Sequence, residues 1–185
     1  MPARISIRLL VVLFLAAAPL SAQGTPEAAA AAFGAAVAAG DFPAAARLMH
    51  PAALRQMHDL FALALTNEKL GEARERIFGF HSLAEASSAP DTVIFAAFLK
   101  TLLSRQPEYA AALKTARLTP LGHIQQGPDT AIVVTRISLD IAGATITQFE
   151  VMPFLREGQA WRGGLKADFT NLAAMLKRLV SPVGG

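Results

Sequence analysis

The most constraining feature of this chain is one long stretch of strand-forming sequence, residues 119–167. β-Branched and aromatic residues alternate with polar ones along it, and small residues with glycine interrupt it twice. Side chains alternate across a strand and short glycine-containing turns join neighbouring strands, so this stretch predicts an antiparallel meander. The four expected strands are residues 118–125, 129–141, 145–156 and 160–167.

The length of the first turn sets the expected register of the meander. A three-residue turn at 142–144 places Arg136 opposite Glu150 and Ile137 opposite Phe149. A two-residue turn would instead place Arg136 opposite Phe149, so the pattern favours the longer turn. On this register the apolar face of the third strand consists of Thr147, Phe149, Val151 and Leu155.

The second turn, residues 157–159, is interpreted in the same way. It pairs Leu155 with Trp161 and Glu150 with Lys166, and it leads us to expect Trp161 in the core, packed on Leu155. Pro153 stands within the third strand. Its missing N–H predicts a bulge or an unpaired edge at that position.

The N-terminus has the three-part layout of a secretory signal peptide. Arg4 and Arg8 form a positively charged region, residues 9–18 are apolar, and small residues ending at Ala22 form a cleavage site. We therefore expect residues 1–22 to be removed and Gln23 to begin the mature chain. The protein would then be periplasmic or secreted, with no stable membrane span. An uncleaved N-terminal anchor is the alternative.

Composition excludes several classes of function. The chain has no cysteine, so it forms no disulfide bond and offers no site for lipid attachment at the cleavage point. Removal of residues 1–22 lowers the 17 basic residues to 15, against 14 acidic ones. No basic patch results, so no nucleic-acid partner is expected. The remaining length suits one domain, expected over residues 23–180, with a flexible tail at 181–185.

Upstream of the strands the sequence predicts helices. Thr25, followed by Pro26 and Glu27, is a strong helix start, and Asp41 can cap a second helix. Segment 79–90 is the loosest part of the chain. The expected helices are residues 28–39, 42–50, 52–65, 68–78, 93–105 and 108–116, with a last one after Asp168. This order predicts an α+β fold, in which N-terminal helices and a C-terminal helix accompany a curved, cone-like, mainly antiparallel sheet of four or more strands.

Two short stretches resemble the nuclear transport factor 2-like superfamily, which includes the SnoaL-like and ketosteroid-isomerase-like proteins. The first is the helix pair at 25–45, and the second is the glycine-containing hairpin at 156–159 with Trp161 after it. The resemblance implies a cone-shaped domain with a concave pocket. In isomerase members a tyrosine and carboxylic acids act on the substrate. The one tyrosine here, Tyr109, lies in a polar helical stretch, and no catalytic residue can be carried over.

Candidate site residues are few. His123 follows a glycine in the first strand and is the histidine best placed to point into a cone, so it and Asp140 are the candidates for catalysis. His81 and Glu85 have a spacing that suits a metal, but no third ligand is near, so neither a metal nor another cofactor is expected. Five aromatic residues are interpreted as the wall of a ligand pocket, with core packing as the alternative: Phe78, Phe80, Phe95, Phe98 and Trp161.

Two functions of different classes remain. The first is an exported, non-catalytic binding or assembly domain, with an apolar pocket for a small apolar ligand or with a dimer face. An assembly role would make a cell-envelope protein the partner. The second is an isomerase or dehydratase that uses an ionisable residue in its cavity. The helix at 93–105 is apolar around more than one face, which predicts a homodimer unless other helices of the chain cover it.

Overall fold

The chain begins with helices and continues into one antiparallel sheet, in a computed structural model that describes residues 24–141, 143–166 and 169. The helices are α1 (Pro26–Ala38), α2 (Phe42–Arg47), α3 (Pro51–Thr66), a short 3₁₀ helix (Glu68–Leu70), α4 (Gly71–Phe78), α5 (Leu83–Ser88), α6 (Asp91–Ser104) and α7 (Pro107–Lys114). The strands are β1 (Arg117–Gln125), β2 (Thr130–Ile141), β3 (Ala144–Glu157) and β4 (Ala160–Gly163), in that spatial order. This arrangement confirms the predicted α+β class. The expected signal peptide, the tail and all but Phe169 of the helix expected after Asp168 lie outside the described residues.

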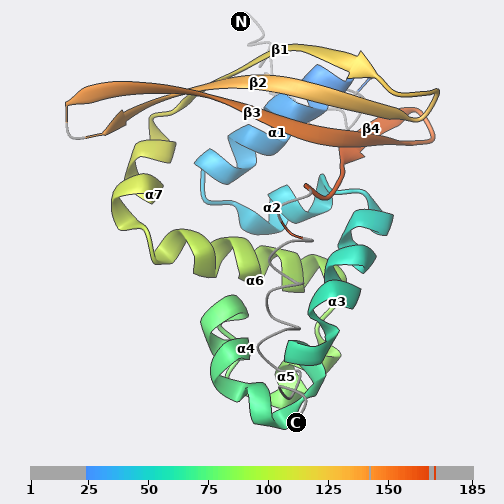
Figure 1. The fold of residues 1–185 in the computed structure, drawn as a ribbon, viewed down its shortest axis with the longest axis vertical. Helices are drawn as coiled ribbons and strands as arrows, with labels where there is room; N and C mark the ends of the chain where they lie inside the picture. The colour runs from blue at the N-terminus through green and yellow to red at the C-terminus, as the bar shows by residue number, and fades with distance from the viewer. Residues whose placement is uncertain (1–23, 142, 167–168, 170–185) are drawn as a thin grey trace, which may run out of the picture.

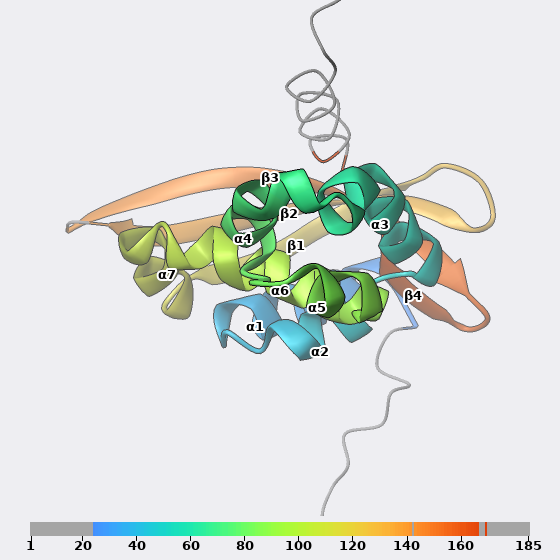
Figure 2. The same cartoon turned by 90° about the horizontal axis from the view of Figure 1, so that it is seen from below.

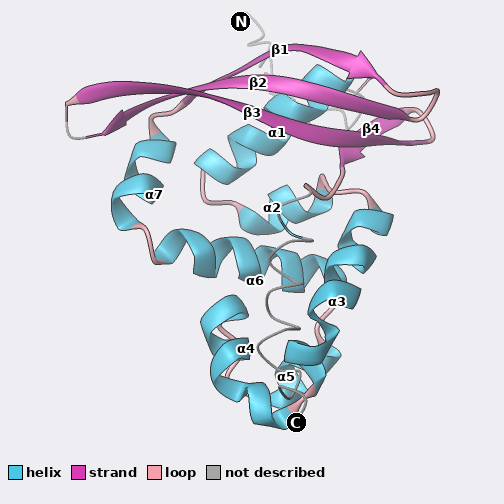
Figure 3. Cartoon of the chain, in the orientation of Figure 1, coloured by secondary structure: helices cyan, strands magenta, loops and turns pink. Residues whose placement is uncertain are grey.

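The described helices all lie on one side of the sheet, and the molecule narrows away from it (Figure 1). α1 crosses directly beneath the sheet and contacts all four strands. α2 and α6 pack on each other in the next layer, and α4 and α5 lie farthest from the strands (Figures 2 and 3). Each strand therefore has an inner face toward the helices and an outer face that no described helix covers.

The predicted helix starts are formed by the expected capping residues. The Thr25 hydroxyl accepts a hydrogen bond from the Ala28 backbone N–H at 3.2 Å, and an Asp41 carboxylate oxygen accepts one from Ala44 at 2.9 Å. Proline stands in the first turn of both helices, where its missing N–H has no helical partner to lose. Local sequence therefore determines where these two helices begin.

α5 lies in the segment that was expected to be loosest. The Ser82 hydroxyl accepts a hydrogen bond from the Glu85 N–H at 3.1 Å, and the Glu85 carboxylate accepts one from the His81 N–H at 3.0 Å. These are the reciprocal contacts of a capped helix N-terminus. The four-residue spacing of His81 and Glu85 is therefore explained by capping, and not by a metal site.

A mainly aromatic and aliphatic core joins the helices below α1. One stripe of apolar side chains on α3 is buried, and it packs against aromatic side chains from α4, α6 and the segment that follows α4. α6 contacts α2, α3, α4 and α7, which cover most of the apolar surface predicted to form a dimer face. Val93 and Leu102 remain 46% and 43% exposed on it. The buried stripe of α3 is Leu54, Met57, Phe61 and Leu65.

The predicted register of the meander is wrong by one residue at both turns. Ile141 pairs with Ala144 across a two-residue turn, so Arg136 lies opposite Phe149 and not opposite Glu150. At the second turn Glu157 pairs with Ala160, and Trp161 therefore lies opposite Arg156. Gly143 and Gly158 have φ values of 81° and 62°, the left-handed conformation that two-residue hairpin turns require.

This shift exchanges the two faces of β3. β2 points Val133, Ile137 and Leu139 inward, and all three are buried. On β3, however, the residues expected in the core point outward: Phe149 is 62% exposed and Val151 is 52% exposed. The inward residues of β3 that the register places opposite β2 are Gln148, Glu150, Met152 and Phe154.

Pro153 lies at an edge position, one of the two alternatives predicted for it. Its carbonyl accepts a hydrogen bond from the Gly164 N–H at 2.7 Å, on the side of β3 that faces β4. The N–H and C=O of one strand residue point to the same side, so the missing donor also faces β4, just where that strand ends. The ladder to β2 continues through Pro153 without a bulge.

Candidate ligand cavity

The five aromatic residues predicted to form a pocket wall lie in the core. Phe78 is 2% exposed, and its ring meets those of Phe61, Phe80 and Phe98 at centroid distances of 5.4, 6.0 and 6.2 Å. Trp161, 7% exposed, packs in a second cluster between α1 and the sheet. None of the five lines the cavity described below. Core packing, the alternative interpretation, accounts for their positions.

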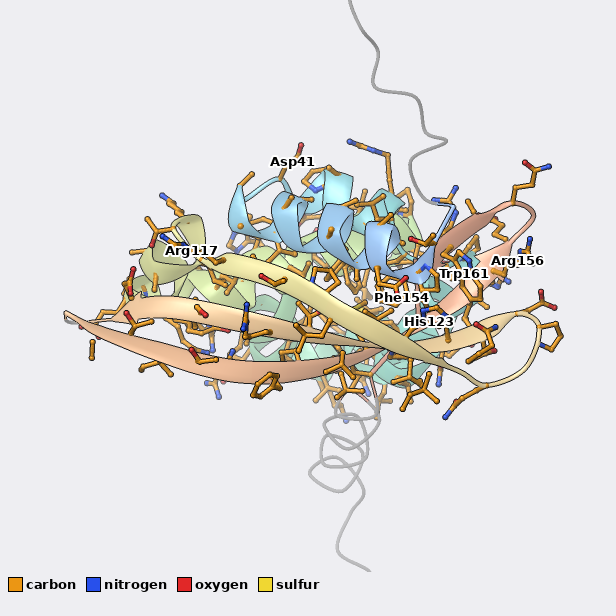
Figure 4. The ribbon with its side chains drawn as sticks, turned by 90° about the horizontal axis from the view of Figure 1, so that it is seen from above. Asp41, Arg117, His123, Phe154, Arg156 and Trp161 are labelled. Atoms are coloured by element: carbon orange, nitrogen blue, oxygen red, sulfur yellow. The ribbon has the colours of Figure 1, made fainter. Side chains whose placement is uncertain are left out.

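His123 does not reach into the cavity either. Its Nδ1 lies 2.6 Å from the Glu27 carboxylate, so the contact joins β1 to the first turn of α1. Figure 4 shows His123 near Phe154 and Trp161, while Arg117 lies at the other end of β1. The hydrogen bond from His123 is the main reason that the pKa of the Glu27 carboxyl lies below its ordinary value of 4.5.

We predict that the His123–Glu27 contact makes stability depend on pH. Because the pKa of Glu27 is lower in the folded chain, the contact stabilises the fold above the unfolded-state pKa, and that contribution is lost as pH falls through the folded value. Denaturant unfolding between about pH 6 and pH 3 should show a shallower loss of stability for Glu27→Gln than for the wild type. Glu108→Gln, which changes an exposed carboxyl, is the control. Parallel pH curves for Glu27→Gln and the wild type would contradict the prediction.

Asp140 lies on the outer face of the sheet. One of its carboxylate oxygens accepts a hydrogen bond from the Thr145 hydroxyl at 2.7 Å. The carboxylate borders a polar cleft of about 270 Å³ that also contains Arg117 and Arg136. Within the described residues neither of these arginines forms an ion pair. The two proposed catalytic residues, His123 and Asp140, are therefore on different parts of the molecule and form no common site.

An apolar cavity of about 280 Å³ lies between the helices and the inner face of the sheet. α1, α6 and α7 form one side, and β1, β2 and β3 form the other. Leu102, at 43%, is the one exposed residue among those that line it, so we infer that the cavity opens to solvent beside this side chain. Its apolar lining is Ala30, Phe33, Gly34, Val37, Leu99, Leu102, Leu103, Leu113, Leu118, Ile137, Met152 and Phe154.

Four polar side chains also line this cavity. Glu150 and Thr135 are cross-strand partners on the inner face, and the Glu150 carboxylate forms an ion pair with the Lys166 ammonium group. The Tyr109 hydroxyl, on α7, accepts a hydrogen bond from the Gln148 amide at 3.4 Å. The predicted contact between Glu150 and Lys166 thus exists, although the register from which it was derived is wrong.

The predicted register puts Glu150 on the face of the third strand opposite its apolar residues, and Tyr109 is predicted in a polar helical stretch. Both reach the cavity because β3 presents its even-numbered residues inward and α7 packs against β2. Glu150 shares its face of β3 with Met152 and Phe154, because every second residue of a strand points to the same side. These two apolar side chains are the sequence signal that could have placed Glu150 on the inner face, and Phe154 is indeed fully buried.

The described residues contain no group of three or more histidine, aspartate or glutamate side chains placed to hold a metal ion. None of the helices within that part of the chain has the length and hydropathy needed to cross a membrane. No protein family model matches the sequence, and neither a curated protein nor a solved structure is significantly similar to it.

Proposed function

We propose that this protein is an exported, non-catalytic binding domain that holds one small, mainly apolar molecule in the cavity beneath its sheet. The observation that carries the proposal is the cavity of about 280 Å³, in which hydrophobic side chains surround a few polar groups. Ligand sites in proteins are concave and mostly apolar, with a small number of polar groups that orient the ligand. Export is supported by the three-part layout of residues 1–22.

The polar groups restrict the chemistry of the ligand. Glu150 and Lys166 compensate each other's charge, so the lining supplies no net charge for a strongly ionic ligand. Together with Thr135 and the Tyr109 hydroxyl, they supply hydrogen-bond donors and acceptors at one part of an otherwise apolar wall. A neutral molecule with an apolar body and one hydrogen-bonding group therefore fits best.

A fluorescent probe of this chemistry tests the proposal. N-phenyl-1-naphthylamine is neutral, has a naphthyl and a phenyl group joined by one N–H, and we expect it to bind saturably with one site per chain. Leu102→Trp should weaken binding at least about tenfold, because the larger ring fills the cavity entrance. Leu63→Trp is the matched control, since Leu63 is 40% exposed on α3 and outside the cavity. Absence of saturable binding by the wild type, or equal affinity in both variants, would overturn the proposal.

The second candidate function is an isomerase or dehydratase. It is favoured by one observation: a carboxylate and a phenol, Glu150 and Tyr109, line the same cavity. A carboxylate could accept a proton from a bound substrate while the phenol donates a hydrogen bond to the oxygen where charge develops. A bound molecule recovered chemically changed from the wild type, and unchanged from Glu150→Gln, would favour this function over simple binding.

A further inference from the structure

The outer face of the sheet carries a polar cleft that the proposed function does not use. Its volume is about 270 Å³, and its lining comes from the end of α7 and from β1, β2 and β3. Figure 4 looks down on this face, with Arg117 at the start of β1. Every described residue that lines the cleft has a charged or hydroxyl side chain. Charge and hydrogen bonds therefore decide what this cleft can hold.

Four of the lining residues form a square on two neighbouring strands. Arg117 of β1 lies opposite Ser138 of β2, and Thr119 of β1 lies opposite Arg136 of β2. All four line the cleft, so their side chains share the outer face. The two arginines occupy one diagonal of the square, and the two hydroxyl side chains occupy the other. We call these four residues the arginine square.

The two guanidinium groups of the square lack a carboxylate partner within the described residues. The ion pairs of that part of the chain include neither Arg117 nor Arg136. Diagonal neighbours in an antiparallel sheet are about 7–8 Å apart, within reach of long side chains. Two like charges at this spacing repel each other, whereas an anion placed between them attracts both. The square therefore has the charge arrangement of an anion site.

Hydroxyl groups around the square differ in what they can donate to an anion. The Thr145 hydroxyl already donates to Asp140 at 2.7 Å, and the Thr115 hydroxyl donates to a backbone carbonyl of α7 at 3.1 Å. The Ser138 hydroxyl lies 3.4 Å from that of Thr147, and it can accept from that group while it donates to a ligand. The square thus offers two guanidinium groups and hydroxyl donors to the oxygens of one anion.

Asp140 also lines the cleft and limits the size of the anion. It stands four residues beyond Arg136 on β2, which is about 13 Å along the strand. Two guanidinium groups outweigh this one carboxylate, so the cleft stays positively charged. A small anion at the arginine square is attracted. A long polyanion, such as a nucleic acid, would also meet the carboxylate, which argues against it.

An exposed aromatic ring stands next to the square. Phe149 of β3 is the cross-strand partner of Arg136 and is 62% exposed. Val151, 52% exposed, continues the same face beside Val134 of β2, on the side of the square away from Asp140. An anion with an apolar group attached can therefore cover these side chains while its oxygens lie between the two arginines.

We propose that the arginine square binds the phosphate group of a small phosphate monoester whose organic part is apolar and packs on Phe149. A phosphate monoester has close to two negative charges and three acceptor oxygens, which matches two guanidinium groups and the hydroxyls between them. Arginine binds such oxygens in pairs through its planar fork of N–H groups. The site is on the opposite side of the sheet from the apolar cavity, and it does not rest on the function proposed for that cavity.

Isothermal titration calorimetry with 1-naphthyl phosphate, in a buffer without phosphate, tests this proposal. We expect saturable binding for which inorganic phosphate competes. The variant that combines Arg117→Gln with Arg136→Gln should bind at least about a hundredfold more weakly, because each change removes hydrogen bonds to a charged group. Both positions are exposed, so its far-ultraviolet circular dichroism should not change. Arg55→Gln removes the same charge from an exposed position of α3 and should bind like the wild type.

Further variants assign the parts of the site. Phe149→Ser should weaken the binding of 1-naphthyl phosphate at least about fivefold and leave that of inorganic phosphate unchanged. Ile124→Ser, at a 63% exposed position elsewhere on the outer face, should change neither. Asp140→Asn should strengthen the binding of both at least about twofold, because a like charge is removed. Leu102→Trp, which blocks the inner cavity, should leave phosphate binding unchanged, so this test and that of the proposed function can fail separately.

Vesicles of phosphatidylcholine that contain phosphatidic acid identify the source of the phosphate ester. Sedimentation of the wild type with these vesicles, lost in the double arginine variant, would show that the site binds a lipid headgroup. Protein that stays in solution but binds 1-naphthyl phosphate would show that it binds a soluble ester. Absence of 1-naphthyl phosphate binding by the wild type would overturn the proposal, and so would equal weakening by Arg55→Gln and by the double variant.

Discussion

Trp161→Ala is expected to lower the free energy of unfolding by about 3–5 kcal/mol. The indole is 7% exposed and packs with small residues of α1, Ala29 and Ala30, and with the buried side chains of Val133 and Phe154. These neighbours belong to α1, β2 and β3, which cannot all move to fill the space of a deleted indole. The variant therefore loses apolar contacts and gains a cavity in the layer that holds α1 on the sheet.

Denaturant unfolding followed by far-ultraviolet circular dichroism measures this loss, because the variant has no tryptophan left for fluorescence. Trp161→Phe should lose much less, since an aromatic ring still fills most of the space. Leu63→Ala, at a position that is 40% exposed, should lose less than about 1 kcal/mol. A loss below about 1 kcal/mol for Trp161→Ala would show that the indole is not a core residue.

Phe78→Ala should destabilise the fold by a similar amount, about 3–5 kcal/mol. The ring is 2% exposed and meets Phe61 edge-on at a centroid distance of 5.4 Å. It also stacks with Phe80 at 6.0 Å. Deletion of the ring removes both aromatic contacts and the apolar area that they bury.

This variant also decides between the two interpretations of the phenylalanine cluster. If the cluster is core, N-phenyl-1-naphthylamine should bind the folded Phe78→Ala protein with the affinity of the wild type, because Phe78 does not line the cavity. Thermal unfolding and probe titration give the two quantities. A stability close to that of the wild type, combined with weaker probe binding, would show that Phe78 belongs to a ligand site.

The helices could be predicted closely from the sequence because their ends are determined by neighbouring residues. Thr25 and Asp41 cap the helices that they were expected to cap. α5 has an equally local signal that the prediction did not use, because Ser82 and Glu85 have the spacing of a capping box. The spacing of His81 and Glu85, which suits a metal, belongs to the same cap. His50, expected at the end of a helix, instead accepts a hydrogen bond from the Ala52 N–H at the start of α3.

The register could not be predicted in the same way, because alternation alone does not say which face of a strand is buried. On β3 both sets of alternating residues contain apolar side chains. The prediction placed the set containing Phe149 inside, whereas α1 packs against Phe154 and Met152, which belong to the other set. Because the outer face of β3 also carries apolar side chains, hydrophobicity alone selects the wrong set of residues as the inner face.

The cavity depended on that register and on tertiary packing. Glu150 reaches it only because a two-residue turn precedes β3, and Tyr109 only because α7 packs on β2. The lining comes from six helices and strands and from Lys166, which follows β4. A repeat of apolar residues within one helix or strand cannot predict which residues of the others it will meet. The contact of Glu150 with Lys166 was predicted correctly because the partners are near each other on either register.

The position of α1 affects when, during and after synthesis, its packing on the sheet can form. Glu27 contacts His123, which follows it by 96 residues, and the connection between α2 and α3 hydrogen-bonds to Gly163 through Leu48 and His50. α1, the first described helix, therefore cannot bury all of its inner face until β4, the last described strand, has been made. Contacts between such distant segments slow folding.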